Sequence, residues 1–370
     1  MKIRKSTLDS IIISFCLISP IIPKDFAKAA VLISISSLVY VLFFRLNFKN
    51  YGFKLIMLML LIPSIILTTF YSAENLIRFV YLLLLIIFYP FNLKLNFKYL
   101  NNLSFFIIFY LVITQLFIVF NNSFILDFRE IFYAHTWGWV WDEGPITSFS
   151  QIGNYRSGGL YYNPNVLASL VIIYFFIFLI TLENFSYTRV FFYSFTVFLV
   201  IVSIILTDTR TVMVSFLAFF LLKVLSYKKE KNFLKIMMLG IIFLAALSIK
   251  DKILVGFTEM GSLNIKIRIL LNYIENVNLL NLMIGGRYDV FFDSEYGYWL
   301  GALGLIGLIS VLLLIIFLYS KIPDSRLFIL TFLLLSVGNS VFYGLLTGYV
   351  ATQFIIITVC LYLDKLQNKI

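Results

Sequence analysis

Long apolar runs recur along almost the whole chain, and they constrain its fold more than any other feature. A helix needs about 20 consecutive apolar residues to cross the hydrocarbon core of a bilayer. Runs near this length lie at residues 9–23, 29–44, 54–72, 75–92, 103–120, 164–182, 189–207, 211–227, 233–249, 297–319, 326–344 and 346–363. The sequence therefore predicts an all-α polytopic membrane protein with about twelve transmembrane helices, in a single integral membrane domain over residues 1–370.

The composition excludes the soluble and disordered classes. Of the 370 residues, 61% are hydrophobic and 13% are charged, whereas about a quarter of the residues in a soluble domain are charged. The chain also holds 41 Phe and 23 Tyr against 18 Gly and 7 Pro, a balance that disfavours disorder. Lipid is therefore the expected solvent for most of the surface.

The basic residues lie between the apolar runs and predict the topology. If the amino terminus is inside, the inner segments hold 18 of the 29 Lys and Arg residues, and the outer segments hold 13 of the 18 acidic residues. An excess of Lys and Arg marks the cytoplasmic side of a membrane protein. We therefore expect both termini inside and two long outer loops, approximately 121–163 and 250–296. The net charge of +11 then needs no nucleic-acid partner.

The first apolar run has an alternative interpretation as a signal peptide. Lys2, Arg4 and Lys5 precede it, and residues 27–29 resemble a cleavage site. We expect it to remain as an uncleaved first span, because another apolar run follows at once.

Metal and disulfide chemistry are not expected from this sequence. Cys16 and Cys360 lie in separate apolar runs, and His135 is the only histidine. It lies in an aromatic stretch with the tryptophans at 137, 139 and 141. They are expected to act either as interface anchors or as a surface on which a sugar stacks.

The first outer loop ends in the segment R-S-G-G-L-Y-Y-N-P-N at residues 156–165. Asn163 suits the N-cap and Pro164 the first position of a helix. The alternative interpretation is an anion site, because Arg156 and a helix amino terminus both favour negative charge. The two glycines would let the backbone approach such a ligand closely.

A second motif, T-D-T-R-T at residues 207–211, forms a predicted outer turn. It is interpreted either as a capped hairpin with a local ion pair, or as a site where Arg210 meets a lipid-linked diphosphate at the membrane surface. Two arginines from separate loops would suit a phosphate clamp.

In the second outer loop, apolar residues recur at helical spacing from Ile267 to Val277. This pattern predicts an amphipathic helix at the membrane interface. Gly285 and Gly286 predict its end. The glycines at 301, 304 and 307 in the next span predict close helix packing.

Several carboxylate residues lie between Gly286 and the predicted span at 297–319. Asp293 and Glu295 are interpreted either as part of a solvated loop, or as a general base that accepts a proton from a sugar hydroxyl.

Together these motifs resemble the O-antigen polymerase and O-antigen ligase superfamily of bacterial polysaccharide assembly. The resemblance covers roughly residues 150–310 and rests on R-S-G-G-L-Y-Y-N-P-N-V-L-A at 156–168, T-D-T-R-T at 207–211 and D-S-E-Y-G-Y-W-L-G-A-L-G-L-I-G at 293–307. It implies a metal-independent and cofactor-free glycosyltransferase with a GT-C-like helical fold. Such an enzyme acts at the periplasmic face of the bacterial inner membrane, in lipopolysaccharide O-antigen biosynthesis.

The resemblance also implies the substrates and partners. Donor and acceptor would be undecaprenyl-diphosphate-linked oligosaccharides within the membrane lipid, and a chain-length regulator and a flippase would be partners. Family ligases carry a histidine in the late outer loop, where this chain has Asp293, Ser294 and Glu295, a departure that favours the polymerase. The alternatives are an O-antigen ligase, a capsular polysaccharide polymerase, and a flippase or other transporter of lipid-linked oligosaccharide.

The expected chemistry assigns a role to each motif. Departure of a lipid diphosphate develops negative charge, which fixed guanidinium groups would stabilise. Arg156, Arg210 and Arg268 lead, with Arg287 behind them, and Arg210 is a catalytic candidate. Asp293 or Glu295 would act on the acceptor hydroxyl. The candidate residues for binding the diphosphate and glycan are Arg156, Arg210, Arg268, Arg287, Asn163 and Asn165.

Overall fold

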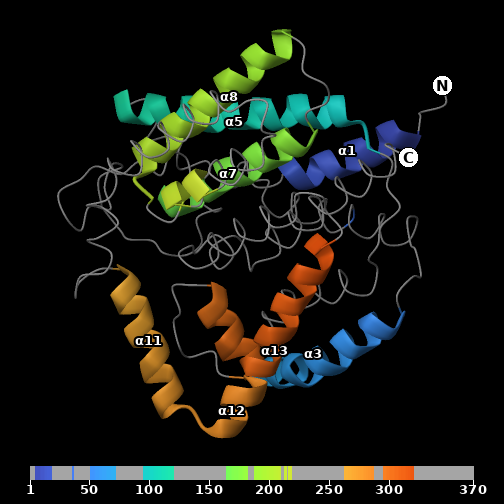
Figure 1. Ribbon diagram of the computed structural model, residues 1–370, viewed down its shortest axis with the longest axis vertical. Helices are drawn as coiled ribbons and strands as arrows, with labels where there is room; N and C mark the ends of the chain where they lie inside the picture. Colours follow the sequence, from blue (N-terminus) through green and yellow to red (C-terminus); the bar gives the residue numbers. More distant parts are fainter. Residues whose placement is uncertain are drawn as a thin grey trace, which may run out of the picture. The chain divides into compact units, whose positions relative to one another are not determined.

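The computed structural model describes residues 5–18, 36, 51–71, 95–120, 164–181, 187–209, 212–214, 216–218, 262–286 and 295–320. Within these ranges the chain is helical and contains no strand, which confirms the predicted all-α class for this part (Figure 1). The helices are α1 (Lys5–Ile18), α3 (Tyr51–Tyr71), α5 (Phe97–Phe120), α7 (Pro164–Thr181), α8 (Tyr187–Thr207), α11 (Ser262–Asn276), α12 (Leu279–Ile284) and α13 (Glu295–Ser320).

The chain divides into two compact units. The first comprises Met1–Leu58, Glu74–Thr209 and Val341–Ile370, and the second comprises Met59–Ala73 and Arg210–Ser340. Helices α1, α5, α7 and α8 belong to the first unit. Helices α11, α12 and α13 and most of α3 belong to the second.

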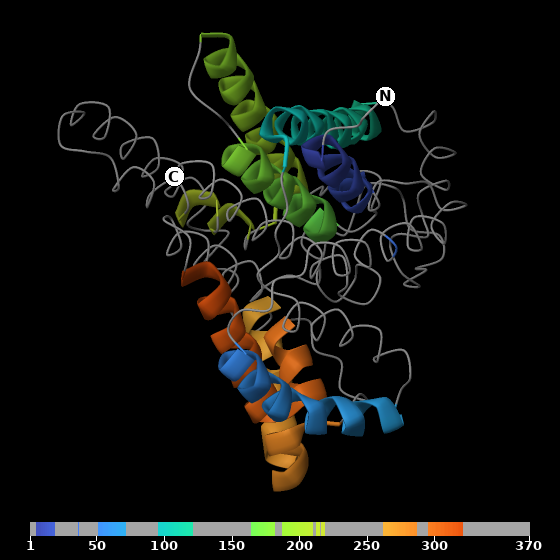
Figure 2. The same ribbon diagram turned by 90° about the vertical axis from the view of Figure 1, so that its right-hand side faces the viewer.

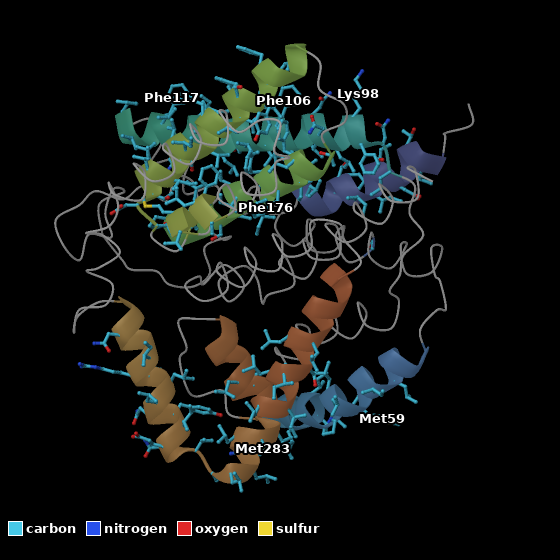
Figure 3. The ribbon with its side chains drawn as sticks, in the orientation of Figure 1. Met59, Lys98, Phe106, Phe117, Phe176 and Met283 are labelled. Carbon is cyan, nitrogen blue, oxygen red and sulfur yellow. The ribbon has the colours of Figure 1, made fainter. Side chains whose placement is uncertain are left out.

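Within the described ranges, one segment is long and apolar enough to cross a membrane, Phe97–Phe117 in α5. Shorter apolar segments lie at Leu167–Leu179, Phe191–Thr207 and Leu300–Ser310. Phe106 and Phe117 of α5 are exposed, as expected of side chains that contact lipid (Figure 3). Several predicted spans, such as 75–92 and 326–344, lie outside the described residues.

Two polar side-chain contacts show that α5 and α7 run in opposite directions. The Asn101 side-chain amide, near the start of α5, donates to the Phe178 carbonyl at 2.8 Å and to Thr181 Oγ1 at 3.2 Å, near the end of α7. Amide hydrogen bonds of this kind join helices in an apolar environment, where water cannot replace them.

Aromatic contacts show that α5 and α8 run in the same direction. Phe105 packs edge-on against Phe192 with ring centroids 5.3 Å apart, and Phe109 lies 6.5 Å from Phe195. Lys98 and Phe117 mark the two ends of α5 (Figure 3). The start of α7 and the end of α8 therefore both lie at the Phe117 end of this group of helices.

Helix α1 is joined to this group through polar contacts at two levels. The Asn96 amide donates to Ser10 Oγ at 2.6 Å, and the buried Tyr174 hydroxyl of α7 donates to the Leu17 carbonyl. Leu17 lies in the last turn of α1, where carbonyls lack a partner within the helix. The four helices form one group in both views (Figure 2).

Substitution of Asn101 by alanine is expected to lower the free energy of unfolding by about 1 to 2 kcal/mol, because two hydrogen bonds between α5 and α7 are lost. Asn102 provides a matched control, since it is exposed on the same turn of α5. Thermal unfolding in detergent should show a lower Tm for Asn101→Ala and an unchanged Tm for Asn102→Ala. Equal Tm values would contradict the assigned contact.

In the second unit, α11 packs against α12 and α13. Tyr273 and Leu300 form the buried centre of this contact, and Ile269, Leu270, Val277, Leu282 and Leu308 surround it. The predicted amphipathic helix is confirmed, but its apolar residues divide into two groups. Leu270 and Val277 pack inward, whereas Ile267, Leu271 and Ile274 are exposed.

Helix α13 is interrupted at Gly304, where φ is 66° and ψ is −174°. Gly285, which ends α12 with φ of 89°, lies against this break. The Gly286 amide donates to the Ala302 carbonyl at 3.2 Å, and so satisfies a carbonyl beside the interruption. The close backbone approach predicted from the glycine row does occur at Gly304, and it comes with a break in α13 that the sequence did not predict.

Candidate functional site

The 156–165 motif leads into α7, which begins at Pro164 as the sequence predicts. Proline is favoured here because the first amide of a helix has no partner within the helix. Pro164 and Leu167 are both buried, so the first turn of α7 lies inside the unit. Asn165 lies in this turn, whereas Arg156 and Asn163 lie outside the described residues.

The 207–211 motif ends α8 in a capped turn. Asp208 adopts a left-handed conformation with φ of 46°, and its amide donates to the Ile204 carbonyl at 3.1 Å. Thr207 Oγ1 donates to the same carbonyl at 3.0 Å, and Thr209 is buried. Residues 207–209 form a turn at the end of α8, whereas Arg210, and with it the predicted hairpin and ion pair, lies outside the described residues.

The described parts of these two motifs, the start of α7 and the end of α8, lie at the same end of the first unit. Helix α7 starts there and α8 finishes there, because α7 is antiparallel to α5 and α8 is parallel to it. The amino terminus of α7 offers amide donors to an anion. This end of the unit can therefore present amide donors to a negatively charged ligand.

The late outer loop contributes candidate residues in the second unit. Arg268 is exposed on α11, and Glu295 is the first residue of α13. Arg287 and Asp293 lie outside the described residues. Gly285 and Gly286 were predicted to end the amphipathic helix, which is wrong: α11 ends at Asn276, and the two glycines instead follow the separate short helix α12.

Sequence reasoning missed several buried polar side chains within the apolar runs. Asp9, Gln115 and Ser203 are fully buried in α1, α5 and α8 respectively. A polar residue within an apolar run usually faces other helices, and this rule could have identified Gln115 and Ser203 from sequence. Among the described residues, no group of three or more His, Cys, Asp or Glu side chains is placed to hold a metal ion.

Comparison with protein-family models gives no match to this chain, and comparison with curated proteins gives none either. The motifs and the geometry of the two units therefore carry the functional proposal.

Proposed function

We propose that this chain is an O-antigen polymerase, a membrane glycosyltransferase that joins undecaprenyl-diphosphate-linked oligosaccharide units at the periplasmic face of the bacterial inner membrane. In this proposal the chain crosses the membrane about twelve times, with both termini cytoplasmic. The observation that supports it most directly is that the segments flanking 156–165 and 207–211 share one end of the first unit.

The donor diphosphate is proposed to bind through Arg156 and Arg210, with Asn163 and Asn165 at the start of α7. Guanidinium groups suit this role because they are always charged and bind phosphate oxygens in pairs. They stabilise the charge that develops on the departing diphosphate without a metal ion. Arg268 and Arg287 are proposed to contribute from the late outer loop.

The acceptor hydroxyl is proposed to lose its proton to Asp293 or Glu295. We expect Asp293→Asn or Glu295→Gln to lower the rate of chain extension by about 100-fold or more, because a general base contributes about that factor. Synthesis of polymer by membranes from cells that express each variant measures this rate. Asp289→Asn, in the same segment, is the matched control and should keep its activity. Wild-type rates in both variants would contradict a base among these two residues.

The size profile of the lipopolysaccharide, with and without this gene in its source strain, tests the proposed function. Loss of the ladder, with core that still carries a single repeat unit, is expected because ligation of one unit continues without polymerisation. Bare core with long glycan left on the lipid carrier would instead indicate a ligase. An unchanged ladder would exclude O-antigen polymerisation and leave a capsule or another surface glycan as the product.

A flippase is the second candidate, because α13 is interrupted at Gly304 and interrupted helices are typical of transporter substrate sites. In such sites the freed backbone groups face a cavity that holds substrate. Here the Gly286 amide binds the Ala302 carbonyl, and Gly285 lies against the break. A protein amide therefore occupies one carbonyl of the interruption that a transported substrate would otherwise face, which favours the polymerase. Bare core with trapped single repeat units on the gel would indicate the flippase.

A further inference from the structure

Ser203 is fully buried in α8, and its hydroxyl has no hydrogen-bond partner in the part of the chain that the structure describes. Two other buried hydroxyls in this unit donate within their own helix. Ser104 Oγ donates to the Leu100 carbonyl at 2.9 Å, and Thr196 Oγ1 donates to the Phe192 carbonyl at 2.7 Å. A buried hydroxyl without a partner is costly, so such a group points to a ligand or water that completes it.

The helix register places Ser203 level with Gln115. Phe105 and Phe109 of α5 lie against Phe192 and Phe195 of α8, in the same order along both helices. Gln115 and Ser203 each follow these contacts by about two turns. Both side chains are fully buried, so both face the interior of the helix group.

The packing of α5 against α7 places the first turn of α7 at the same height along the helix group as Gln115. Asn101 of α5 contacts Phe178 and Thr181 of α7, and the two helices are antiparallel. Gln115 lies fourteen residues beyond Asn101. Counting fourteen residues back along α7 from Phe178 and Thr181 gives residues 164 and 167, the first turn. The unsatisfied hydroxyl and a buried amide therefore lie beside the amino terminus of α7.

We propose that Ser203 and Gln115 line the inner wall of a diphosphate site at the first turn of α7, where the Ser203 hydroxyl donates a hydrogen bond to a phosphate oxygen. This inference rests on the proposed function and adds two binding residues to its donor site. Neutral hydrogen-bond donors suit the buried side of such a site, because they bind an anion without adding a charged side chain that must itself be buried. The amide groups at the start of α7 supply further donors.

Thermal unfolding of the purified full-length protein in detergent tests this site, with inorganic diphosphate and farnesyl diphosphate as probes. Without a probe, Ser203→Ala should unfold at the wild-type Tm or above, because it removes an unsatisfied hydroxyl. With a probe, Ser203→Ala and Gln115→Leu are expected to bind about tenfold more weakly than wild type. Ser104→Ala is the matched control, since its hydroxyl is buried but already satisfied, and it should bind both probes as wild type does.

The outcomes separate this inference from the proposed function. Stronger stabilisation by farnesyl diphosphate than by inorganic diphosphate supports a lipid-linked ligand, and equal stabilisation supports a free diphosphate. Wild-type binding by Ser203→Ala, no binding of either probe to wild type, or a lower Tm of ligand-free Ser203→Ala would each overturn the site. Binding that depends on Ser203, together with an unchanged lipopolysaccharide ladder, would support the site and reject the polymerase.

Discussion

Replacement of Arg156 or Arg210 by alanine is expected to abolish chain extension while the protein accumulates at its normal level. Loss of a fixed donor that stabilises developing negative charge lowers rates by about 100- to 1,000-fold. Lysine at either position should restore only part of the activity, because a single ammonium cannot replace the paired hydrogen bonds of a guanidinium. The measurement is the lipopolysaccharide ladder of a deletion strain that expresses each variant, with the protein quantified by immunoblot.

Arg189 provides the matched control for these substitutions. It lies in the first turn of α8, at the end of that helix opposite the 207–211 motif. Arg189→Ala should therefore leave the ladder unchanged. Full activity in Arg156→Ala and Arg210→Ala would remove both arginines from the donor site, and equal loss in Arg189→Ala would show that any loss of positive charge suffices.

Gly304→Ala is expected to destabilise the protein by more than about 3 kcal/mol, enough to deplete the folded form. The positive φ of Gly304 disfavours any side chain, and an added β-carbon would lie 2.5 Å from the Gly285 amide nitrogen and from the Met283 carbonyl. Because these are backbone atoms, no change of rotamer relieves the overlap. Gly285→Ala should have a similar effect, since its β-carbon would overlap the Ala302 carbonyl. Folded yield and Tm in detergent measure both.

Gly52→Ala is the matched control, because Gly52 lies in α3 and nothing approaches its added β-carbon within 4 Å. Alanine favours a helix over glycine by about 0.5 to 1 kcal/mol, so this variant should be neutral or slightly stabilised. The Gly285→Ala and Gly304→Ala double variant should lose less than the two single variants together, because both changes disrupt one contact. A fully folded Gly304→Ala protein would contradict the interrupted helix.

Local sequence pattern predicts most of the described helices closely. The apolar runs at 103–120, 164–182 and 189–207 correspond to α5, α7 and α8, and the run at 297–319 lies within α13. The agreement has a physical basis, because a backbone in an apolar environment must satisfy its hydrogen bonds within each helix. Pro164 at the first position of α7 and Gly285 after α12 are local signals of the same kind.

Contacts between segments distant in sequence decide the features that the pattern misses. Gly304 lies in a row of glycines that predicts ordinary helix packing, and only its contact with Gly285 accounts for the break in α13. Ser203 is one polar residue within an apolar run, and only the register of α5 and α8 brings it level with Gln115.

The sequence by itself therefore determined the helical class, the positions of the helices and the motifs that carry the proposed chemistry. Tertiary structure decided where α13 breaks, which face of α11 is buried, and that the start of α7 and the end of α8 share one end of the first unit. The physical reason is the range of the interactions involved. Helix formation depends on residues within one or two turns, whereas a positive φ at Gly304 or a buried hydroxyl at Ser203 is tolerated only in the surroundings that distant segments provide.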